Sequence, residues 1–121
     1  MEPAPRILLV DDEPLVLRAV ARQLSRYLRV RTALGAEEAL RALEESAEVE
    51  GFLFDMQMDP VDGPELFARV VARWPELRAR AAVVTGAADS DEVRAFAARE
   101  GVHVIAKPFN SADLLAWLSA R

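Results

Sequence analysis

Short apolar runs alternate with amphipathic stretches along the chain. Continuous apolar runs are typical of buried strands, and apolar residues three and four positions apart are typical of helices that cover a sheet. The pattern predicts strands at about 6–10, 29–33, 51–55, 81–85 and 102–106. It predicts helices at about 14–28, 36–46, 64–73 and 89–99, and a last helix that is capped by Asn110 or Ser111 and ends at about 120.

The strict alternation of strands and helices predicts an α/β fold, a doubly wound parallel sheet with helices on both faces. The strand at 29–33 is expected at an edge, because Arg29 and Arg31 alternate with Val30. The chain has 121 residues, of which 52% are hydrophobic, so it has the length of one domain and enough apolar side chains for a core. We therefore expect one domain over residues 1–121, with no output domain in this chain.

Composition and charge exclude several classes of protein. The net charge is −5 and the two signs are interspersed, which argues against non-specific nucleic-acid binding. Cysteine is absent, and the single histidine, His103, excludes a histidine-rich metal site. No apolar stretch reaches the ~20 residues of a membrane span, and the first residues lack the features of a signal peptide. We expect a soluble, cytoplasmic protein that contacts neither nucleic acid nor membrane directly.

Four of the predicted strands end in polar side chains. The first runs into Asp11 and Asp12, the third ends with Asp55, the fourth ends with Thr85 and the fifth runs into Lys107. Open parallel sheets bind ligands at the carboxyl ends of their strands. Each of these residues has a structural explanation of its own, as a helix cap, a turn residue or a surface lysine. Together they favour one site for a divalent metal and a phosphoryl group.

The residue types at this edge suit phosphoryl transfer. Mg²⁺ or Mn²⁺ prefers oxygen ligands, a role that fits Asp12 and Asp55, with Asp11 holding a metal-bound water. Asp55 is also a candidate nucleophile, because a carboxylate can attack a phosphoryl group and form an aspartyl phosphate. The Lys107 ammonium and the Thr85 hydroxyl are expected to contact phosphoryl oxygens.

Over essentially all of its length the chain resembles the receiver domains of two-component response regulators. The resemblance rests on Ile7-Leu8-Leu9-Val10-Asp11-Asp12-Glu13, on Asp55 with Met58 and Asp62-Gly63, on Thr85-Gly86-Ala87 and on Lys107-Pro108-Phe109. It implies a single (βα)5 flavodoxin-like domain with strand order 2-1-3-4-5. It also implies Mg²⁺-dependent transfer of a phosphoryl group to Asp55 from a histidine kinase or a histidine phosphotransfer protein.

The resemblance implies a role for each matching residue. The match to Asp12 binds the metal directly, the match to Asp11 binds it through water, and Gln57 supplies a backbone carbonyl. The match to Thr85 hydrogen-bonds the phosphoryl group and shifts on activation. The match to Lys107 forms an ion pair with the phosphoryl group and usually precedes a cis peptide bond to proline.

The resemblance implies a signalling protein with slow self-dephosphorylation, and not an enzyme. In the family the kinase docks near the first helix, where Arg18, Arg22 and Arg26 are expected to be exposed. A homodimer through the fourth helix, the fifth strand and the fifth helix is also implied.

Two positions depart from the family pattern. Asp59 stands four residues after the nucleophile, where the family usually has a proline, and the proline follows at Pro60. Asp59 either weakens phosphoryl binding or shifts metal affinity, or it is a solvated loop acid. Val104 stands three residues before the lysine, where many members have an aromatic ring. His103 takes that place only if the strand register slips, and otherwise lies on the surface.

Two other functions are possible for a strand-end aspartate of this kind. Haloacid-dehalogenase-type phosphohydrolases need a second aspartate two residues after the nucleophile, and this chain has Gln57 there. A pseudo-receiver, which binds proteins and is never phosphorylated, is kept open by Asp59 and Val104. The presence of every phosphorylation residue argues against it.

Overall fold

The computed structural model of the chain describes residues 4–108 and 110–120, so Phe109 of the lysine-proline-phenylalanine motif lies outside the described residues. Within them, the strands form one parallel sheet in the order β2-β1-β3-β4-β5, which confirms the predicted fold. The strands are β1 (Arg6–Asp11), β2 (Arg29–Leu34), β3 (Gly51–Asp55), β4 (Ala81–Thr85) and β5 (His103–Ala106). The helices are α1 (Pro14–Leu24), α2 (Gly35–Glu45), α3 (Gly63–Arg73), the 3₁₀-helix η1 (Pro75–Arg80), α4 (Asp91–Glu100) and α5 (Ser111–Ala120).

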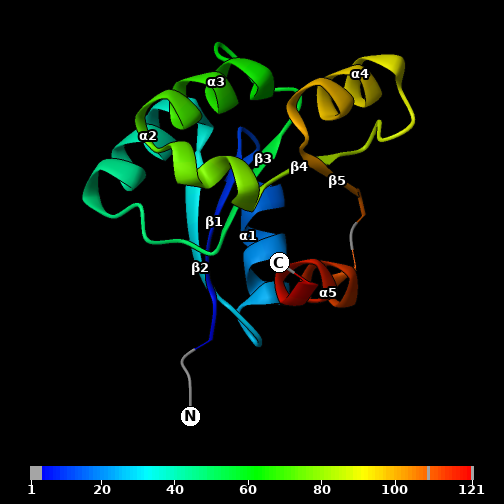
Figure 1. Cartoon of the computed structure of the whole chain (residues 1–121). Helices are drawn as coiled ribbons and strands as arrows, with labels where there is room; N and C mark the ends of the chain where they lie inside the picture. The colour runs from blue at the N-terminus through cyan, green and yellow to red at the C-terminus, as the bar shows by residue number, and fades with distance from the viewer. Residues whose placement is uncertain (1–3, 109, 121) are drawn as a thin grey trace.

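Helices cover both faces of the sheet (Figure 1). On one face, Leu17 and Leu24 of α1 and Leu114 of α5 belong to the same apolar cluster as Ile7 and Ile105 of the sheet. α2, α3 and α4 cover the other face with a larger cluster. Because helices lie on both sides, β3 and β4 bury every residue, which explains their continuous apolar sequences. No helix in the described part of the chain is long and apolar enough to cross a membrane.

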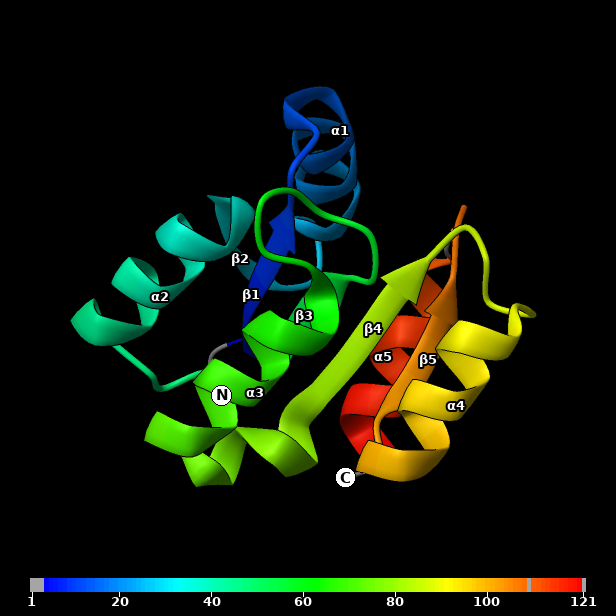
Figure 2. The ribbon, with the colours of Figure 1, turned by 90° about the horizontal axis from the view of Figure 1, so that it is seen from above.

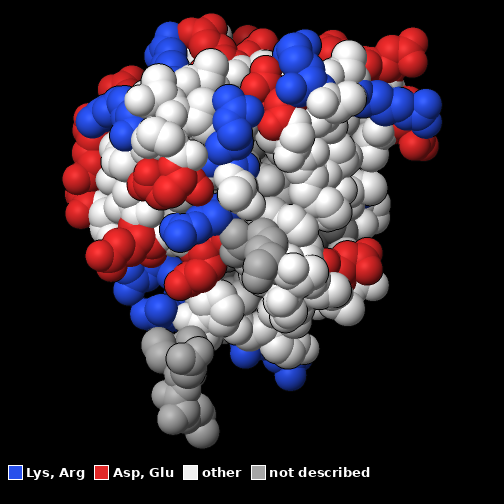
Figure 3. Space-filling view, in the orientation of Figure 1, with Lys and Arg blue, Asp and Glu red and all other residues white. Residues whose placement is uncertain are grey.

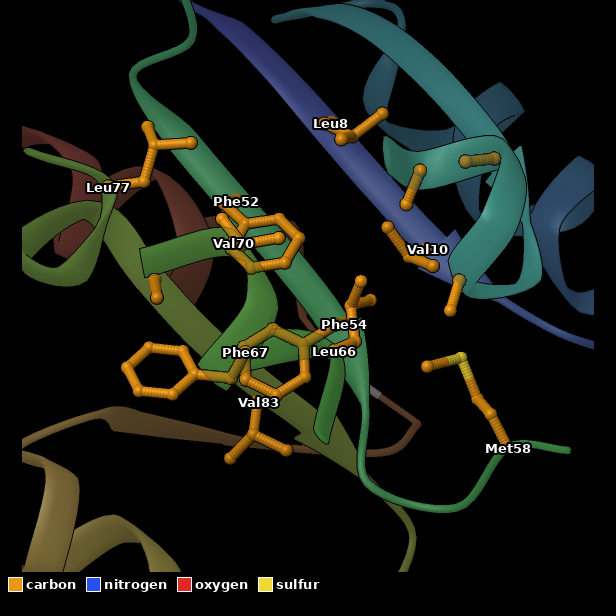
Figure 4. Close-up of a cluster of buried hydrophobic side chains, with 14 of the residues drawn as sticks. Leu8, Val10, Phe52, Phe54, Met58, Leu66, Phe67, Val70, Leu77 and Val83 are labelled. Atoms are coloured by element: carbon orange, nitrogen blue, oxygen red, sulfur yellow. The ribbon is translucent and has the colours of Figure 1, made fainter. Parts of the chain in front are cut away.

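Phenylalanine rings dominate the core beneath the strand that ends in Asp55 (Figure 4). The ring of Phe54 stacks on Phe52 at 5.0 Å and on Phe67 of α3 at 5.9 Å. Phe96 of α4 meets Phe67 edge-on at 5.6 Å. Since Phe54 directly precedes Asp55, this packing fixes the strand end that carries the candidate nucleophile.

Side-chain caps begin three helices. Asp62 at α3, Ser90 at α4 and Asn110 at α5 each accept a backbone N–H from the first turn. Of the two caps that the sequence allows for the last helix, the structure has Asn110.

The end of the first helix differs from the prediction. α1 ends at Leu24, because Arg29 must enter β2 opposite Arg6. The N–H groups of Tyr27 and Leu28 both donate to the Leu24 carbonyl at 2.9 Å, and this tight turn reverses the chain. Leu28 lies beyond the helix but is still buried, which explains why its spacing looked helical.

The segment between α3 and β4 contains an element that the sequence pattern missed. Trp74-Pro75 ends α3 as predicted, but the following residues form η1. Leu77 of η1 is fully buried, and Arg80 donates a hydrogen bond to the Val49 carbonyl, so both side chains hold the segment against the fold.

We predict that Phe96→Ala lowers the free energy of unfolding by about 3–4 kcal/mol, because a buried ring is removed and the cavity is not refilled. Phe96 and Val93 are the buried residues of α4, so few other contacts hold this helix. Urea denaturation measures the change. Leu15→Ala is the control, since Leu15 is 75% exposed, and it should change stability by less than about 0.5 kcal/mol. A loss below about 1 kcal/mol for Phe96→Ala would contradict this account of α4 packing.

Candidate functional site

The predicted site residues meet at the carboxyl ends of the strands. β1 lies between β2 and β3, so the strand order reverses its direction at β1, and open α/β sheets bind ligands at such a point. Asp11 ends β1, Asp55 ends β3, Thr85 ends β4, and Lys107 follows β5. Figure 2 shows this edge from above, with the β3–α3 loop arching beside the N-terminal end of α1.

The site contains the buried polar side chains of the molecule. Among the described residues, the polar or charged side chains that are buried are those of Asp11, Asp55 and Thr85, with relative exposures of 3%, 8% and 2%. Carboxylates are rarely buried unless they are paired with a cation or hydrogen-bonded. The two aspartates therefore need a positive partner.

Lys107 is that partner. Its Nζ lies 2.9 Å from Asp11 Oδ2 and 2.9 Å from Asp55 Oδ2, and it donates a hydrogen bond to each. Among the 15 lysines and arginines of the chain it is the only lysine. A compact ammonium fits between two carboxylates, whereas a guanidinium is a wider, planar fork. With two carboxylates and one ammonium, the site keeps an excess negative charge that attracts a further cation.

The pKa values at the site are shifted by burial and by this bridge. Burial raises the pKa of the Asp55 carboxyl above its ordinary 3.8, and hydrogen bonds from Lys107 and from the Gln57 N–H only partly offset that effect. For Lys107, burial lowers the pKa, but the bonds to Asp11 and Asp55 outweigh it and hold the pKa above 10.5. Lys107 is therefore charged at neutral pH, and Asp55 is more basic than an ordinary carboxylate.

Backbone N–H groups fix the orientation of both carboxylates. Gln57 N donates to Asp55 Oδ1 at 3.1 Å, and Glu13 N donates to Asp11 Oδ1 at 3.1 Å. Each carboxylate thus uses one oxygen for a local turn and the other for Lys107. This arrangement positions the reactive groups before any ligand arrives.

Thr85 is tied to the same network through its backbone. Its carbonyl accepts the Lys107 N–H at 2.8 Å, and its hydroxyl oxygen accepts the Ala87 N–H at 3.0 Å. The second bond fixes the orientation of the hydroxyl. The structure therefore brings together all four predicted strand ends.

An acidic group lies beside the bridge. Oxygens of Asp11, Asp12 and Glu13 lie within 4.8 Å of one another, and oxygen donors of this kind suit Mg²⁺. Glu13 was named from the sequence only as part of the matched motif and was given no role at the site. Its side chain makes no cap to α1, and the signal that could have found it is the unbroken acidic run. Asp55, which was predicted as a metal ligand, does not belong to this acidic group and is joined to Asp11 through Lys107.

Comparison with known proteins decides the family. A sequence model described as the response regulator receiver domain matches residues 7–119. The chain belongs to this family.

Solved receiver domains share the whole fold. A response regulator receiver protein from Pseudomonas putida is 28% identical, with a TM-score of 0.83 over 100% of both chains. A response regulator receiver domain protein from Methanospirillum hungatei is 30% identical, with a TM-score of 0.81 over 98% of this chain and 93% of that chain. The hydrogenase transcriptional regulatory protein HoxA of Cupriavidus necator is 36% identical over 85% of this chain, which spans only 21% of that relative.

The pairing of β5 with β4 decides which way His103 and Val104 point. Thr85 pairs with Ala106, and Val104 packs toward the α2–α4 side. His103 is exposed and stacks on half-buried Trp117 of α5, with ring centroids 5.4 Å apart and planes within 6° of parallel. Since neighbouring strand residues point to opposite faces, His103 cannot take the place of the missing aromatic ring, and that alternative is wrong. The peptide bond between Lys107 and the following proline is cis, as the resemblance implied.

We predict that Asp55→Asn is more stable than the wild type at neutral pH, with a gain of about 2–5 °C in Tm. The substitution leaves Lys107 and Asp11 as a balanced pair. Because burial raises the pKa of Asp55, the wild type loses stability as the pH rises above 3.8 through the folded-state pKa. The difference in Tm should therefore be small near about pH 4 and should grow toward pH 7.

Thermal unfolding at several pH values measures this difference. The control is Glu48→Gln, which removes an exposed carboxylate in the loop before β3 and should give no comparable gain. A lower Tm for Asp55→Asn than for the wild type at pH 7 would mean that the fold needs the Asp55 carboxylate.

Proposed function

We propose that this receiver domain is the phosphoacceptor of a two-component or phosphorelay system. A phosphoryl group passes from a phosphohistidine of a histidine kinase, or of a histidine phosphotransfer protein, to Asp55. One observation carries the proposal: a buried strand-end carboxylate is hydrogen-bonded to the only lysine of a chain whose family consists of signalling domains.

In the proposed reaction, an Asp55 oxygen attacks the phosphorus atom. The new P–O bond forms as the P–N bond breaks, and the bonding electron pair leaves with the imidazole nitrogen of the donor. Such transfers depend mainly on positioning and on neutralising the phosphoryl oxygens. Lys107, which is 2.9 Å from Asp55, neutralises one phosphoryl oxygen, and the Thr85 hydroxyl donates a hydrogen bond to another.

The acidic group supports a divalent cation at this site. As the family resemblance implies, Asp12 and Asp55 would hold Mg²⁺ or Mn²⁺ directly, Asp11 through a water, and Gln57 through its backbone carbonyl. Of these residues, Asp11 and Asp12 belong to the acidic group. When bound, the metal supplies positive charge for the phosphoryl oxygens. Asp11 and Asp12 attract the ion because their carboxylates repel each other without it.

α1 is the proposed docking surface for the phosphodonor. Arg18, Arg22 and Arg26 are exposed on or just after this helix, and Leu15 in its first turn is also exposed. A groove of about 370 Å³ separates α1 from Lys107 and is lined mainly by apolar residues (Val16, Ala19, Val20, Gln23, Lys107 and Pro108). An apolar groove with a basic rim fits an amphipathic helix that carries acidic residues at its edges.

α4, β5 and α5 form the proposed homodimer surface. Figure 3 shows charged side chains of both signs over α2, α3 and α4, and a largely uncharged surface over α5. Depletion of charge is typical of the centre of subunit contacts.

The test is the intact mass of the protein after incubation with acetyl phosphate or phosphoramidate. The wild type is expected to gain one phosphoryl group with Mg²⁺ and none with a chelator, and Asp55→Asn is expected to gain none. An equal adduct on Asp55→Asn would place the acceptor elsewhere. The absence of an adduct on the wild type with both donors would leave a protein-binding role that does not involve phosphorylation.

We predict two effects of Lys107→Ala. Without metal, the two carboxylates lose their cation, so the free energy of unfolding falls by about 1–3 kcal/mol, and Mg²⁺ restores part of it. Phosphorylation by acetyl phosphate slows by about 100-fold, because the phosphoryl oxygens lose a charged donor. Arg41→Ala on α2 is the control, since the one ion pair that Arg41 makes with the described residues, with Glu37, is exposed. Wild-type behaviour of Lys107→Ala in both assays would contradict the role given to the lysine.

A further inference from the structure

The β3–α3 loop is anchored firmly at its base. Met56 and Met58 are buried, and Gly63 N donates to the Met56 carbonyl at 3.0 Å. A Cβ at Gly63 would lie 2.3 Å from the Asp55 carbonyl oxygen, so only glycine allows this close approach. The loop therefore has little freedom where it leaves and rejoins the fold.

The tip of the loop rests on the acidic group. Asp59 N donates to Asp12 Oδ2 at 3.1 Å. A proline at this position, which is usual in receiver domains, has no N–H and cannot make this bond. The Asp59 side chain is exposed, and the ion pairs of the described residues do not include it. The Asp59 backbone is therefore held beside Asp12, and its exposed carboxylate has no ion pair among the described residues.

We propose that Asp59 tunes the affinity of the divalent-cation site. Its N–H orients the Asp12 carboxylate, and its own carboxylate adds negative charge at the rim. The site then binds a divalent cation more tightly than it would with a proline at this position. The inference rests on the proposed function, because it takes Asp11 and Asp12 as the residues that hold the ion.

Both contributions have a known physical scale. Groups that orient a metal-binding side chain typically change metal affinity by about 10- to 100-fold. A unit charge several ångströms from a divalent ion, at a rim exposed to solvent, changes the affinity by about three- to tenfold. Among the ion pairs of the described residues, the Lys107 ammonium bridges Asp11 and Asp55, and none includes Asp12. The charge of Asp59 therefore adds to a site that is already negative.

Two substitutions separate the contributions. Asp59→Asn keeps the backbone N–H and removes the charge, whereas Asp59→Pro removes both. Glu48→Gln is the matched control, because it removes an exposed carboxylate from the loop before β3. The probe is Mn²⁺, and the electron paramagnetic resonance signal of free Mn²⁺ gives the dissociation constant without any phosphorylation step. Circular dichroism checks that each variant is folded, and if Asp59→Pro is unfolded, Asp59→Asn alone decides the role of the charge.

We expect Asp59→Asn to weaken Mn²⁺ binding by about three- to tenfold, Asp59→Pro to weaken it further, and Glu48→Gln to leave it unchanged. A Mn²⁺ dissociation constant of Asp59→Asn within twofold of the wild-type value would overturn the role of the charge. Asp59→Pro that binds as tightly as Asp59→Asn would overturn the orienting role of the N–H. If the wild type binds Mn²⁺ normally, either result rejects the inference about Asp59 and leaves the proposed metal site standing. A wild type that binds no Mn²⁺ rejects the proposed metal site itself.

Discussion

One ammonium held between two buried carboxylates is the interaction on which the functional edge of this domain depends. Lys107 follows the last strand of the sheet, yet its Nζ reaches Asp55 on β3 and Asp11 on β1. The parallel strand order makes this possible, because it brings the carboxyl ends of β1, β3, β4 and β5 to one edge. Each carboxylate is also fixed by a backbone N–H at its other oxygen. The bridge therefore couples three strands of the sheet.

The charge at this edge is a compromise between stability and reactivity. Two buried carboxylates share one cation, and burial holds the pKa of Asp55 above its ordinary value. A domain selected for stability alone would have balanced or removed these charges. The unbalanced arrangement keeps a carboxylate of raised pKa at the strand end and suits the divalent cation of the proposed function. The phenylalanine core beneath β3 supports the strand end that carries Asp55.

Most of the fold follows from the sequence because its signals are local. Apolar periodicity predicts the strands and helices, and a parallel sheet forces the polar ends of its strands to one edge. The remaining features depend on contacts between distant segments. α1 stops at Leu24 because β2 must pair with β1, and η1 is held by the burial of Leu77 and by the Arg80 hydrogen bond to the Val49 carbonyl. The hydrogen bond from the Asp59 N–H to the Asp12 carboxylate joins residues 47 positions apart, so no local sequence pattern predicts it.

The most direct test of the central claim is the pKa of the Lys107 ammonium. Because Lys107 is the only lysine, selective ¹⁵N-lysine labelling gives a single Nζ resonance that can be followed with pH by nuclear magnetic resonance. The account predicts a pKa above 10.5 in the wild type, falling when Asp55→Asn removes one partner. A wild-type pKa at or below 10.5 that Asp55→Asn does not change would mean that Lys107 does not bridge the two carboxylates in solution.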